Sequence, residues 1–162
     1  MDRLWSPWRS EYIASSEVNS ETSVCVFCEI QKDAQNDERN LVVHRASHAF
    51  VVLNLYPYTS GHLLIVPNEH LGELDAAGKE ATDEMMDLTK LSQTALREVY
   101  KPAGFNVGMN LGRPAGAGIA DHIHIHILPR WSGDTNFMTT VGETRVLPED
   151  LATTYRKLRS KF

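Results

Sequence analysis

The sequence predicts an α+β domain with a mostly antiparallel sheet of five strands. Short segments rich in β-branched residues, each bounded by turn residues, stand before and after one long segment with a helical period. The order is strands, helix, strands and helix, which differs from the regular alternation of parallel α/β folds. At 162 residues, the chain is long enough for one domain with a core and too short to divide comfortably into two.

Three strands are expected before the long helix. Their segments are "LVVHR" at 41–45, "HAFVVLN" at 48–54 and "GHLLIVP" at 61–67. Each is short, rich in β-branched residues and bounded by residues typical of turns, which is the pattern of a strand. "YPYTSG" at 56–61 is the turn that joins the last two, because proline, serine and glycine interrupt the apolar pattern.

A long helix is expected from about Lys79 to Tyr100. Apolar or small residues recur near one face at helical spacing, and the charged residues fall largely elsewhere. Pro102 and Gly104 then end the helix. The residues near the apolar face are Ala81, Met85, Leu88, Ser92, Ala95 and Val99, and the charged residues away from it are Asp83, Glu84, Asp87 and Lys90.

Two further strands and a second helix are expected after the long helix. "FNVGMN" at 105–110 is a strand, "GRPAGAG" at 112–118 is a glycine-rich loop, and the histidine-rich segment that begins at Asp121 is the fifth strand. A last helix opens at Pro148, because acidic residues follow at once and basic residues come later, as the helix dipole favours. These residues are Glu149 and Asp150, then Arg156, Lys157 and Arg159.

Composition excludes several classes of protein. The formal net charge is -5, so no basic field for general nucleic-acid binding is expected. No run of about 18 apolar residues is present, so no membrane span is expected. Residues 1–12 lack the continuous apolar core of a signal peptide. We therefore expect a cytoplasmic protein with no nucleic-acid or membrane partner.

The chain is expected to divide into three parts. Residues 1–23 form an irregular arm, because polar and small residues dominate and no period holds. Residues 24–145 form the domain, and residues 146–162 form the C-terminal helix. The arm carries tryptophan, tyrosine and arginine side chains, which are unusual in a free tail, so we expect it to dock on the domain or on a partner subunit.

The two cysteines of the chain stand in "CVFC", as Cys25 and Cys28. A reducing cytoplasm disfavours a structural disulfide between them. Their C-x-x-C spacing fits either a redox pair or half of a metal site. A thioredoxin-like motif follows a strand and opens a helix, whereas this one follows a polar stretch. Both interpretations stay open at this point.

Three of the seven histidines alternate with isoleucines at 122–127. Side chains two apart in a strand share a face and lie about 6.5 to 7 Å apart. Solvated histidines on a sheet face, or a metal site made of the row alone, are the simpler interpretations. A row also suits catalysis, because a neutral imidazole attacks phosphorus while its neighbours bind the phosphate or protonate the leaving oxygen. The row is His122, His124 and His126, and the core-anchoring residues are Ile123, Ile125 and Ile127.

The loop before the row suits phosphate binding. Its small residues let backbone N–H groups approach a phosphate closely, although a flexible hairpin turn is the simpler interpretation. No Gly-Lys-Ser/Thr follows, so it is not a Walker A loop. Asn110 stands at the loop entrance, where it either donates to a phosphate oxygen or caps the turn. The small residues are Gly112, Ala115, Gly116, Ala117 and Gly118.

"HIHIHIL" resembles the signature of the histidine-triad (HIT) superfamily of nucleotide hydrolases and transferases. The similarity extends from "CVFCEI" through "GHLLIVPNEH" to "PRW", which is nearly the whole domain. "LWSPWRSEYI" and "PRWSGDTNFM" resemble a bacterial branch akin to diadenosine tetraphosphate phosphorylases, also called ATP adenylyltransferases. The resemblance implies a HIT-like fold and a homodimer whose sheet continues across the interface.

The resemblance also implies roles for individual residues. His124 matches the nucleophile, which forms a covalent nucleotidyl-histidine on the α-phosphate, and His126 matches the histidine that contacts the phosphate and the bridging oxygen. His62 matches a further histidine close to the triad. Asn54 stands where many members have an aspartate that binds the ribose hydroxyls, and Asn110 matches an asparagine that touches the phosphates. Gly116, Ala117 and Gly118 of the glycine-rich loop are also expected to border the substrate, through their backbone N–H groups.

A zinc site is implied as well. In several bacterial members, two cysteines, a histidine after the "IVP" strand and the first histidine of the signature hold zinc. The matching residues here are Cys25, Cys28, His70 and His122. Four protein ligands make a closed, structural site. Free thiols and a surface histidine are the simpler interpretation, and no organic cofactor is expected.

One feature departs from the family. Many members have Gln-Ser or Gln-Thr at the positions of Gly118 and Ile119. Two side-chain phosphate contacts are therefore missing, which favours the phosphorylase-like branch over the Hint-type phosphoramidate hydrolases. We expect cleavage of a dinucleoside polyphosphate with phosphate or water as acceptor; a Hint-type hydrolase and a nucleotide-binding protein without turnover are the alternatives. His44 and His48 are expected at the surface or the sheet edge.

Overall fold

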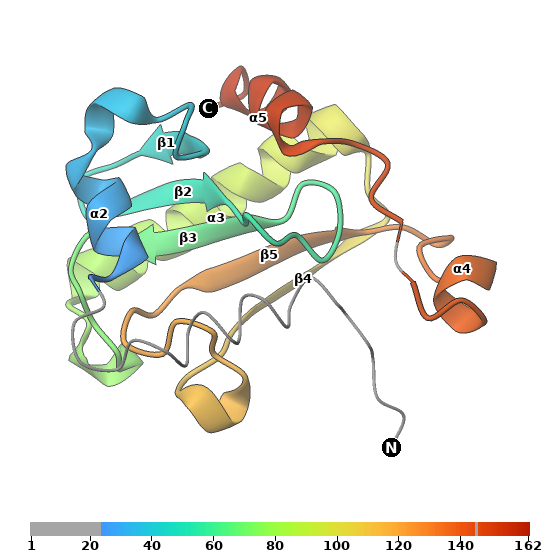
Figure 1. The fold of residues 1–162 in the computed structure, drawn as a ribbon. Helices are drawn as coiled ribbons and strands as arrows, with labels where there is room; N and C mark the ends of the chain where they lie inside the picture. Colours follow the sequence, from blue (N-terminus) through green and yellow to red (C-terminus); the bar gives the residue numbers. More distant parts are fainter. Residues whose placement is uncertain (1–23, 145) are drawn as a thin grey trace.

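Five strands form one antiparallel sheet in the order β1-β2-β3-β5-β4 (Figure 1). The computed structural model describes residues 24–144 and 146–162, so the predicted arm at 1–23 lies outside the described residues. The predicted α+β class with a five-stranded antiparallel sheet is confirmed. The strands are β1 Val42–Arg45, β2 Ala49–Leu53, β3 Leu63–Pro67, β4 Gly104–Met109 and β5 Ile125–Arg130.

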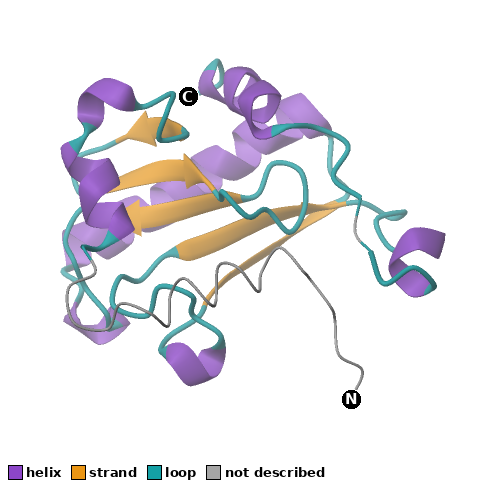
Figure 2. Cartoon of the chain, viewed as in Figure 1, coloured by secondary structure: helices purple, strands orange, loops and turns teal. Residues whose placement is uncertain are grey.

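Helices pack on both faces of this sheet (Figure 2). The α-helices are α2 Val26–Lys32, α3 Lys79–Tyr100, α4 Phe137–Thr140 and α5 Leu151–Arg159. Short 3-10 helices occur at Ala34–Asn36, Leu74–Ala76 and Arg113–Ala115. None of the helices in the described part of the chain is long and apolar enough to cross a membrane.

The strands divide their side chains between two apolar clusters. Val51 and Leu53 of β2 face the cluster that contains the buried residues of α3 and α5. Phe50 and Val52 face the other side, where Phe27 of α2 covers them. This alternation follows from the two-residue period of a strand. The segment with the two cysteines therefore lies on the sheet face opposite the long helix.

The long helix begins and ends where the sequence predicts. Lys101 takes the left-handed conformation with φ of 48°, and its N–H donates to the carbonyl of Arg97 at 3.1 Å. This cap and the following Pro102 end α3. The buried residues of α3 are Ala81, Met85, Leu88, Thr89, Ser92, Ala95 and Leu96. The predicted apolar face is thus the face that packs on the sheet.

The strand that carries the histidines begins later than predicted. β5 starts at Ile125, so only His126 lies within it, and His122 and His124 lie in the segment just before it. The partner strand β3 ends at Pro67, which has no N–H to extend the ladder. The Pro67 carbonyl instead bonds to Nε2 of His122 at 2.9 Å.

The alternation of histidine and isoleucine nevertheless persists through this segment. Ile123 is 2% exposed, Ile125 7% and Ile127 0%, and the latter two belong to the core under α3. The rings of His122 and His124 lie on the opposite side, each in contact with Phe27. The predicted separation of an anchoring face from a histidine face therefore holds, although two of the three histidines precede the strand.

The last helix also begins later than predicted. α5 starts at Leu151, and Pro148 and Glu149 precede it. Asp150 is the N-cap: its backbone is extended, and its side chain accepts the N–H of Thr153 at 2.8 Å. An aspartate with a free β-carboxylate caps a helix better than it continues one, which moves the start past the proline.

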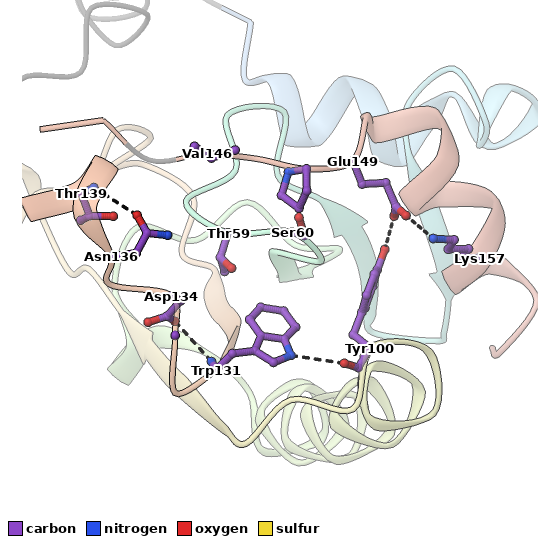
Figure 3. A pocket seen from close by; sticks show the side chains of 12 residues that line it. Thr59, Ser60, Tyr100, Trp131, Asp134, Asn136, Thr139, Val146, Glu149 and Lys157 are labelled. Carbon is purple, nitrogen blue, oxygen red and sulfur yellow. Dashed lines mark hydrogen bonds and ion pairs between the residues drawn. The ribbon is translucent and has the colours of Figure 1, made fainter. Parts of the chain in front are cut away.

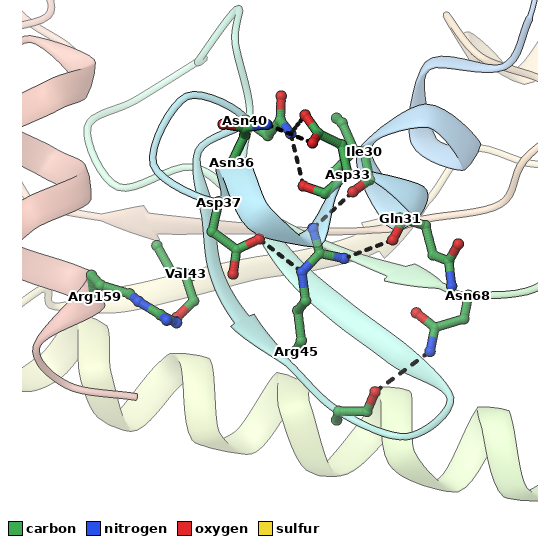
Figure 4. Close-up of polar contacts among 11 residues, drawn as sticks. Ile30, Gln31, Asp33, Asn36, Asp37, Asn40, Val43, Arg45, Asn68 and Arg159 are labelled. Carbon is green, nitrogen blue, oxygen red and sulfur yellow. Dashed lines mark hydrogen bonds and ion pairs between the residues drawn. The ribbon is translucent and has the colours of Figure 1, made fainter.

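No helix is expected from the sequence at Val26–Lys32, where α2 forms with Cys25 as its N-cap. Arg45 of β1 fastens the far end of this helix to the sheet (Figure 4). Its guanidinium donates to the carbonyls of Ile30 at 2.7 Å and Gln31 at 3.3 Å, and its Nε bonds to Asp37 at 2.8 Å. These carbonyls are the ones that a helix end leaves without partners. The two cysteines are thereby held over the sheet.

Candidate functional site

Two cysteines and two histidines, expected as a metal set, converge beside the start of the histidine row. Their four ligand atoms all lie within 4.8 Å of one another. Sγ of Cys25 lies 3.3 Å from Nδ1 of His122, and Sγ of Cys28 lies 3.2 Å from Nδ1 of His70 and 3.7 Å from Nδ1 of His122. Tetrahedral zinc places sulfur and nitrogen ligands about 3.5 Å apart, so these residues fit the ion.

His122 is oriented for ligation. Its ring is fully buried, and its Nε2–H donates to the Pro67 carbonyl at 2.9 Å. The unprotonated Nδ1 therefore faces the thiols, in the arrangement that zinc-binding histidines use. Cys25 caps α2, Cys28 follows one turn later, and both are free thiols. The C-x-x-C segment does open a helix, but the two imidazoles beside it favour a metal site over a redox pair.

His124 presents one nitrogen to the neighbouring cavity. Its Nδ1–H donates to the backbone carbonyl of His122 at 2.9 Å. This bond fixes the tautomer and leaves the lone pair on Nε2. Burial lowers the pKa of His124, and the ring is 7% exposed. The imidazole is thus neutral near pH 7, as a nucleophile must be.

His126 is held by a chain of hydrogen bonds from the loop between β2 and β3. The N–H of Tyr58 and the amide of Asn54 both lie 3.2 Å from Nδ1 of His62, which therefore accepts. The proton of His62 must then be on Nε2, which donates to Nδ1 of His126 at 2.9 Å. His126 in turn carries its proton on Nε2. Burial, followed by the nearby His126, lowers the pKa of His62 to about 3, so this ring stays neutral.

The two adjacent rings therefore have complementary roles. The ring centroids of His124 and His126 lie 4.9 Å apart, with an angle of 60° between the planes. His124 offers a lone pair and His126 offers an N–H. The ring of Tyr58 stacks on that of His126, at 6.1 Å and 15°. A phosphate placed between the two rings would meet a nucleophile and a hydrogen-bond donor together.

A small cavity of about 80 Å³ opens in front of these two rings. The structure brings together here most of the predicted substrate residues, namely Asn54, Asn110, Gly116, Gly118, His124 and His126. Sequence reasoning missed the remaining walls, which are Phe27, Tyr56, Tyr58, Leu64 and Ile119. The aromatic pair in "YPYTSG" was a usable signal, whereas the apolar wall was not recognisable before the fold was known.

The glycine-rich loop differs in detail from the predicted amide cradle. The N–H groups of Gly116 and Ala117 donate inside the loop, to Arg113 and Gly112. The amide of Asn110 also braces the loop, donating to the Gly116 carbonyl at 3.3 Å. The backbone hydrogen bonds inside the loop do not use the N–H of Gly118. Of Gly116, Ala117 and Gly118, which were expected to border the substrate, only Gly118 keeps an N–H that the loop itself does not use.

The two remaining histidines lie outside this arrangement. His44 sits on the edge strand β1 and packs against Phe162, with the ring centroids 5.6 Å apart. His48 is exposed between β1 and β2. Neither borders the cavity or the metal set.

Comparisons with known proteins agree with this geometry. A family model described as HIT domain matches residues 35–133. The chain is 41% identical over 167 residues to an AP-4-A phosphorylase of Mycobacterium tuberculosis, covering 100% of this chain and 85% of that protein. It is 26% identical over 138 residues to an adenosine 5'-monophosphoramidase of Schizosaccharomyces pombe, covering 85% and 98%. A Zn-bound histidine triad family protein from Mycobacterium smegmatis superposes with a TM-score of 0.68 at 29% identity, covering 85% and 91%.

Proposed function

The chain belongs to the HIT family, and we propose that it transfers a nucleotidyl group from a dinucleoside polyphosphate to phosphate or water. The observation that carries this proposal is the pair of neighbouring rings, with a lone pair on Nε2 of His124 and a proton on Nε2 of His126. Similarity to an AP-4-A phosphorylase along the whole chain supports diadenosine tetraphosphate as the substrate.

In the first step, Nε2 of His124 attacks the α-phosphorus. A P–N bond forms while the P–O bond to the leaving nucleoside polyphosphate breaks. The leaving group departs as an anion and needs no proton; the N–H of His126 donates a hydrogen bond to its oxygen. The charge that develops on His124 is stabilised by the His122 carbonyl, which accepts its Nδ1–H at 2.9 Å.

In the second step, an acceptor oxygen attacks the nucleotidyl-His124 intermediate. The P–N bond breaks, and the lone pair returns to Nε2. With inorganic phosphate as acceptor, diadenosine tetraphosphate yields ATP in the first step and ADP in the second. With water, the second product is AMP.

The surrounding polar groups supply binding. One hydrogen and one lone pair of the Asn54 amide remain for a ribose hydroxyl, beyond the bonds to His62 and to the N–H of Tyr56. The N–H of Gly118, which the loop itself does not use, points to a phosphate contact, and Asn110 holds the loop in place while it borders the cavity. Gly116, which has no side chain, and Ala117, which has a small one, contribute only room for the substrate, because their N–H groups already donate inside the loop.

The metal set is proposed to hold structural zinc. Cys25, Cys28, His70 and His122 supply four ligands, so no open position remains for substrate. When bound, the ion cross-links α2, the segment after β3 and the start of the histidine row. His122 then holds its carbonyl in place for His124.

The remaining expectations concern organisation. We propose a homodimer that extends the sheet, which is supported by the place of β4 at the sheet edge. The division at residues 24–145 and 146–162 and a cytoplasmic location stay predictions; the two free thiols fit a reducing compartment.

Product analysis with diadenosine tetraphosphate tests the proposal. ATP and ADP, formed only when phosphate is added, identify a phosphorylase; ATP and AMP without phosphate identify a hydrolase. Turnover of an adenosine phosphoramidate in preference to the dinucleotide would favour the Hint-type alternative, which the similarity to an adenosine 5'-monophosphoramidase supports. Tight nucleotide binding without any turnover would overturn the proposed enzyme.

A further inference from the structure

A second cavity, larger than the one at the triad, lies away from the histidine row. Its volume is about 450 Å³, within the range of small-molecule sites. It is bordered by the turn before β3, the end of α3, the segment after β5 and the start of α5 (Figure 3). No residue assigned above to catalysis, phosphate binding or metal binding lines it.

The charged groups of this cavity are already paired. Asp134 receives two bonds from Arg130, at 2.6 and 3.0 Å. Glu149 receives the hydroxyl of Tyr100 at 2.5 Å and forms an ion pair with Lys157. The lining therefore holds no unpaired cation among the described residues. A phosphate or carboxylate ligand would displace an existing pair, whereas an uncharged ligand would not.

Two aromatic rings form flat walls. The rings of Trp131 and Tyr100 stand at 88° with centroids 6.5 Å apart. Their polar ends are bonded within the protein, since Nε1–H of Trp131 donates to the Tyr100 carbonyl at 3.2 Å and the Tyr100 hydroxyl donates to Glu149. Nζ of Lys157 lies over the Tyr100 ring, 5.7 Å from its centroid. The face of Trp131 is therefore the one that suits a planar ring.

Unused polar groups accompany these rings. The hydroxyl of Ser60 is buried and has no hydrogen-bond partner within the described part of the chain. Asn136 uses its carbonyl oxygen to cap α4, and Figure 3 shows its amide nitrogen directed into the cavity. A buried hydroxyl without a partner is costly unless a ligand or water satisfies it.

We propose that this cavity is a second ligand site, separate from the triad pocket, which takes an uncharged nucleoside. The planar base stacks on Trp131, and the hydroxyl and amide groups of Ser60 and Asn136 bond to the sugar or the base edge. Base stacking on an aromatic side chain contributes roughly 1–3 kcal/mol. The site follows from its own lining and does not depend on the reaction proposed for the triad.

The site is linked to the triad through one turn. Thr59 and Ser60 border the cavity, and the same turn places Tyr58 on His62. The carbonyl of Thr59 also accepts the N–H of His62 at 3.2 Å. A nucleoside that presses on this turn changes how His62 holds His126, so occupancy of the second site alters kcat.

Titration of the isotope-labelled full chain with adenosine, followed by ¹H–¹⁵N NMR, tests this site. The indole N–H of Trp131 and the amides of Ser60 and Thr139 report on it, and the side-chain amides of Asn54 and Asn110 report on the triad pocket. Saturable shifts of the first set, with contacts from adenosine protons to the Trp131 ring, are expected. Shifts confined to the second set would overturn the proposal.

Matched variants separate the two sites. Trp131→Leu is expected to weaken the binding that Ser60 and Thr139 report by about tenfold or more, and Trp131→Phe to retain most of it. Asn110→Ala should leave these signals unchanged. If inorganic phosphate and not adenosine moves the Trp131 indole signal, the proposed ligand class is wrong. The wild-type contacts decide the matter if the leucine variant does not fold.

Discussion

The two ends of the histidine row hold their imidazoles by different means. His122 is fully buried, bonds to the Pro67 carbonyl and turns its other nitrogen towards two thiols. His126 is partly exposed and accepts from His62, whose own orientation depends on the backbone of Tyr58. The same side chain is therefore suited to metal binding at one end and to hydrogen-bond donation at the other, because its neighbours differ.

Because the two ends are held differently, substitutions at His122 and its partners should affect stability, and substitutions around His126 should affect the rate of turnover. The metal end of the row, which is His122 with the other residues of the metal set, joins regular elements. α2, the end of β3 and the segment before β5 meet there. The phosphate end of the row, which is His126 with His62, depends on the loop at 54–62. This loop sets the tautomer of His62 and contributes little to the hydrophobic core. We expect changes at the metal end to reduce stability and changes at the phosphate end to reduce rate.

The largest effect on turnover is expected from His124, which lies between the two ends of the row. His124→Ala removes the proposed nucleophile, so kcat on diadenosine tetraphosphate should fall by about 10⁴-fold or more. His48→Ala is the matched control, because His48 is an exposed histidine outside the site; its kcat should stay within about twofold of wild type. Residual activity of His124→Ala within tenfold of wild type would contradict the mechanism.

Loss of one metal ligand should act on stability. Cys28→Ser leaves the buried His122 without a complete metal set, so the bound zinc should be lost and unfolding should cost about 3 kcal/mol less, or roughly 10 °C in Tm. Metal analysis and thermal unfolding measure both. Lys32→Ala, on the exposed side of the same helix, is the control.

The kcat of Cys28→Ser tests whether the metal end and the phosphate end act separately. Below its lowered Tm, the variant should keep kcat within a few fold of wild type. A large loss of kcat in fully folded Cys28→Ser would show that the two ends of the row do not act separately.

The features predicted correctly are those that a repeated pattern specifies. The limits of α3 follow from a period sustained over six turns and from Pro102. The strands follow from short β-branched runs, and the metal set follows from the family resemblance, since the Cys25–Cys28 spacing alone left a redox pair equally open. The helix and strand signals are local in sequence, so they can be recognised without knowledge of the fold. The metal set joins Cys25 to His122 and is not local, so only the resemblance indicated it.

The features missed depend on contacts between distant segments. α2 has seven residues, too few to show a period, and Arg45 stabilises it from β1. The start of β5 is set by Pro67 on its partner strand. The role of Tyr58 rests on a backbone N–H, which its side-chain identity does not reveal. The second cavity is formed by four separate segments of the chain, so no local motif indicates it.

A smaller effect is expected at the phosphate end. Asn54 donates to Nδ1 of His62, and Asn54→Asp replaces this donor by a carboxylate. The carboxylate favours a proton on Nδ1, where the N–H of Tyr58 already points, so His126 loses its fixed tautomer. We expect kcat to fall about tenfold and the acid limb of its pH profile to move to higher pH, because the new charge raises the pKa of His62.

Asn54→Ala provides the comparison for that change. It removes the ribose contact but leaves Tyr58 as the donor to His62, so KM should rise while kcat and the pH profile stay close to wild type. Thermal unfolding should change by less than about 3 °C in both variants. If aspartate and alanine give the same pH profile, Asn54 does not set the tautomer.

The smallest expected effect is on the pH dependence of the free energy of unfolding, to which His62 at the phosphate end contributes. Burial lowers the pKa of His62 to about 3 from its ordinary value of 6.5, so folding favours the neutral ring. This stability is complete above pH 6.5 and is lost as pH falls towards 3, at up to about 1.4 kcal/mol per pH unit. His62→Gln has no titrating ring, so its free energy of unfolding, measured with urea between about pH 6 and pH 4, should fall less steeply than that of wild type. The metal ligands are unchanged in both proteins, so the difference in slope belongs to the phosphate end alone, and equal slopes would show that His62 is not held neutral there.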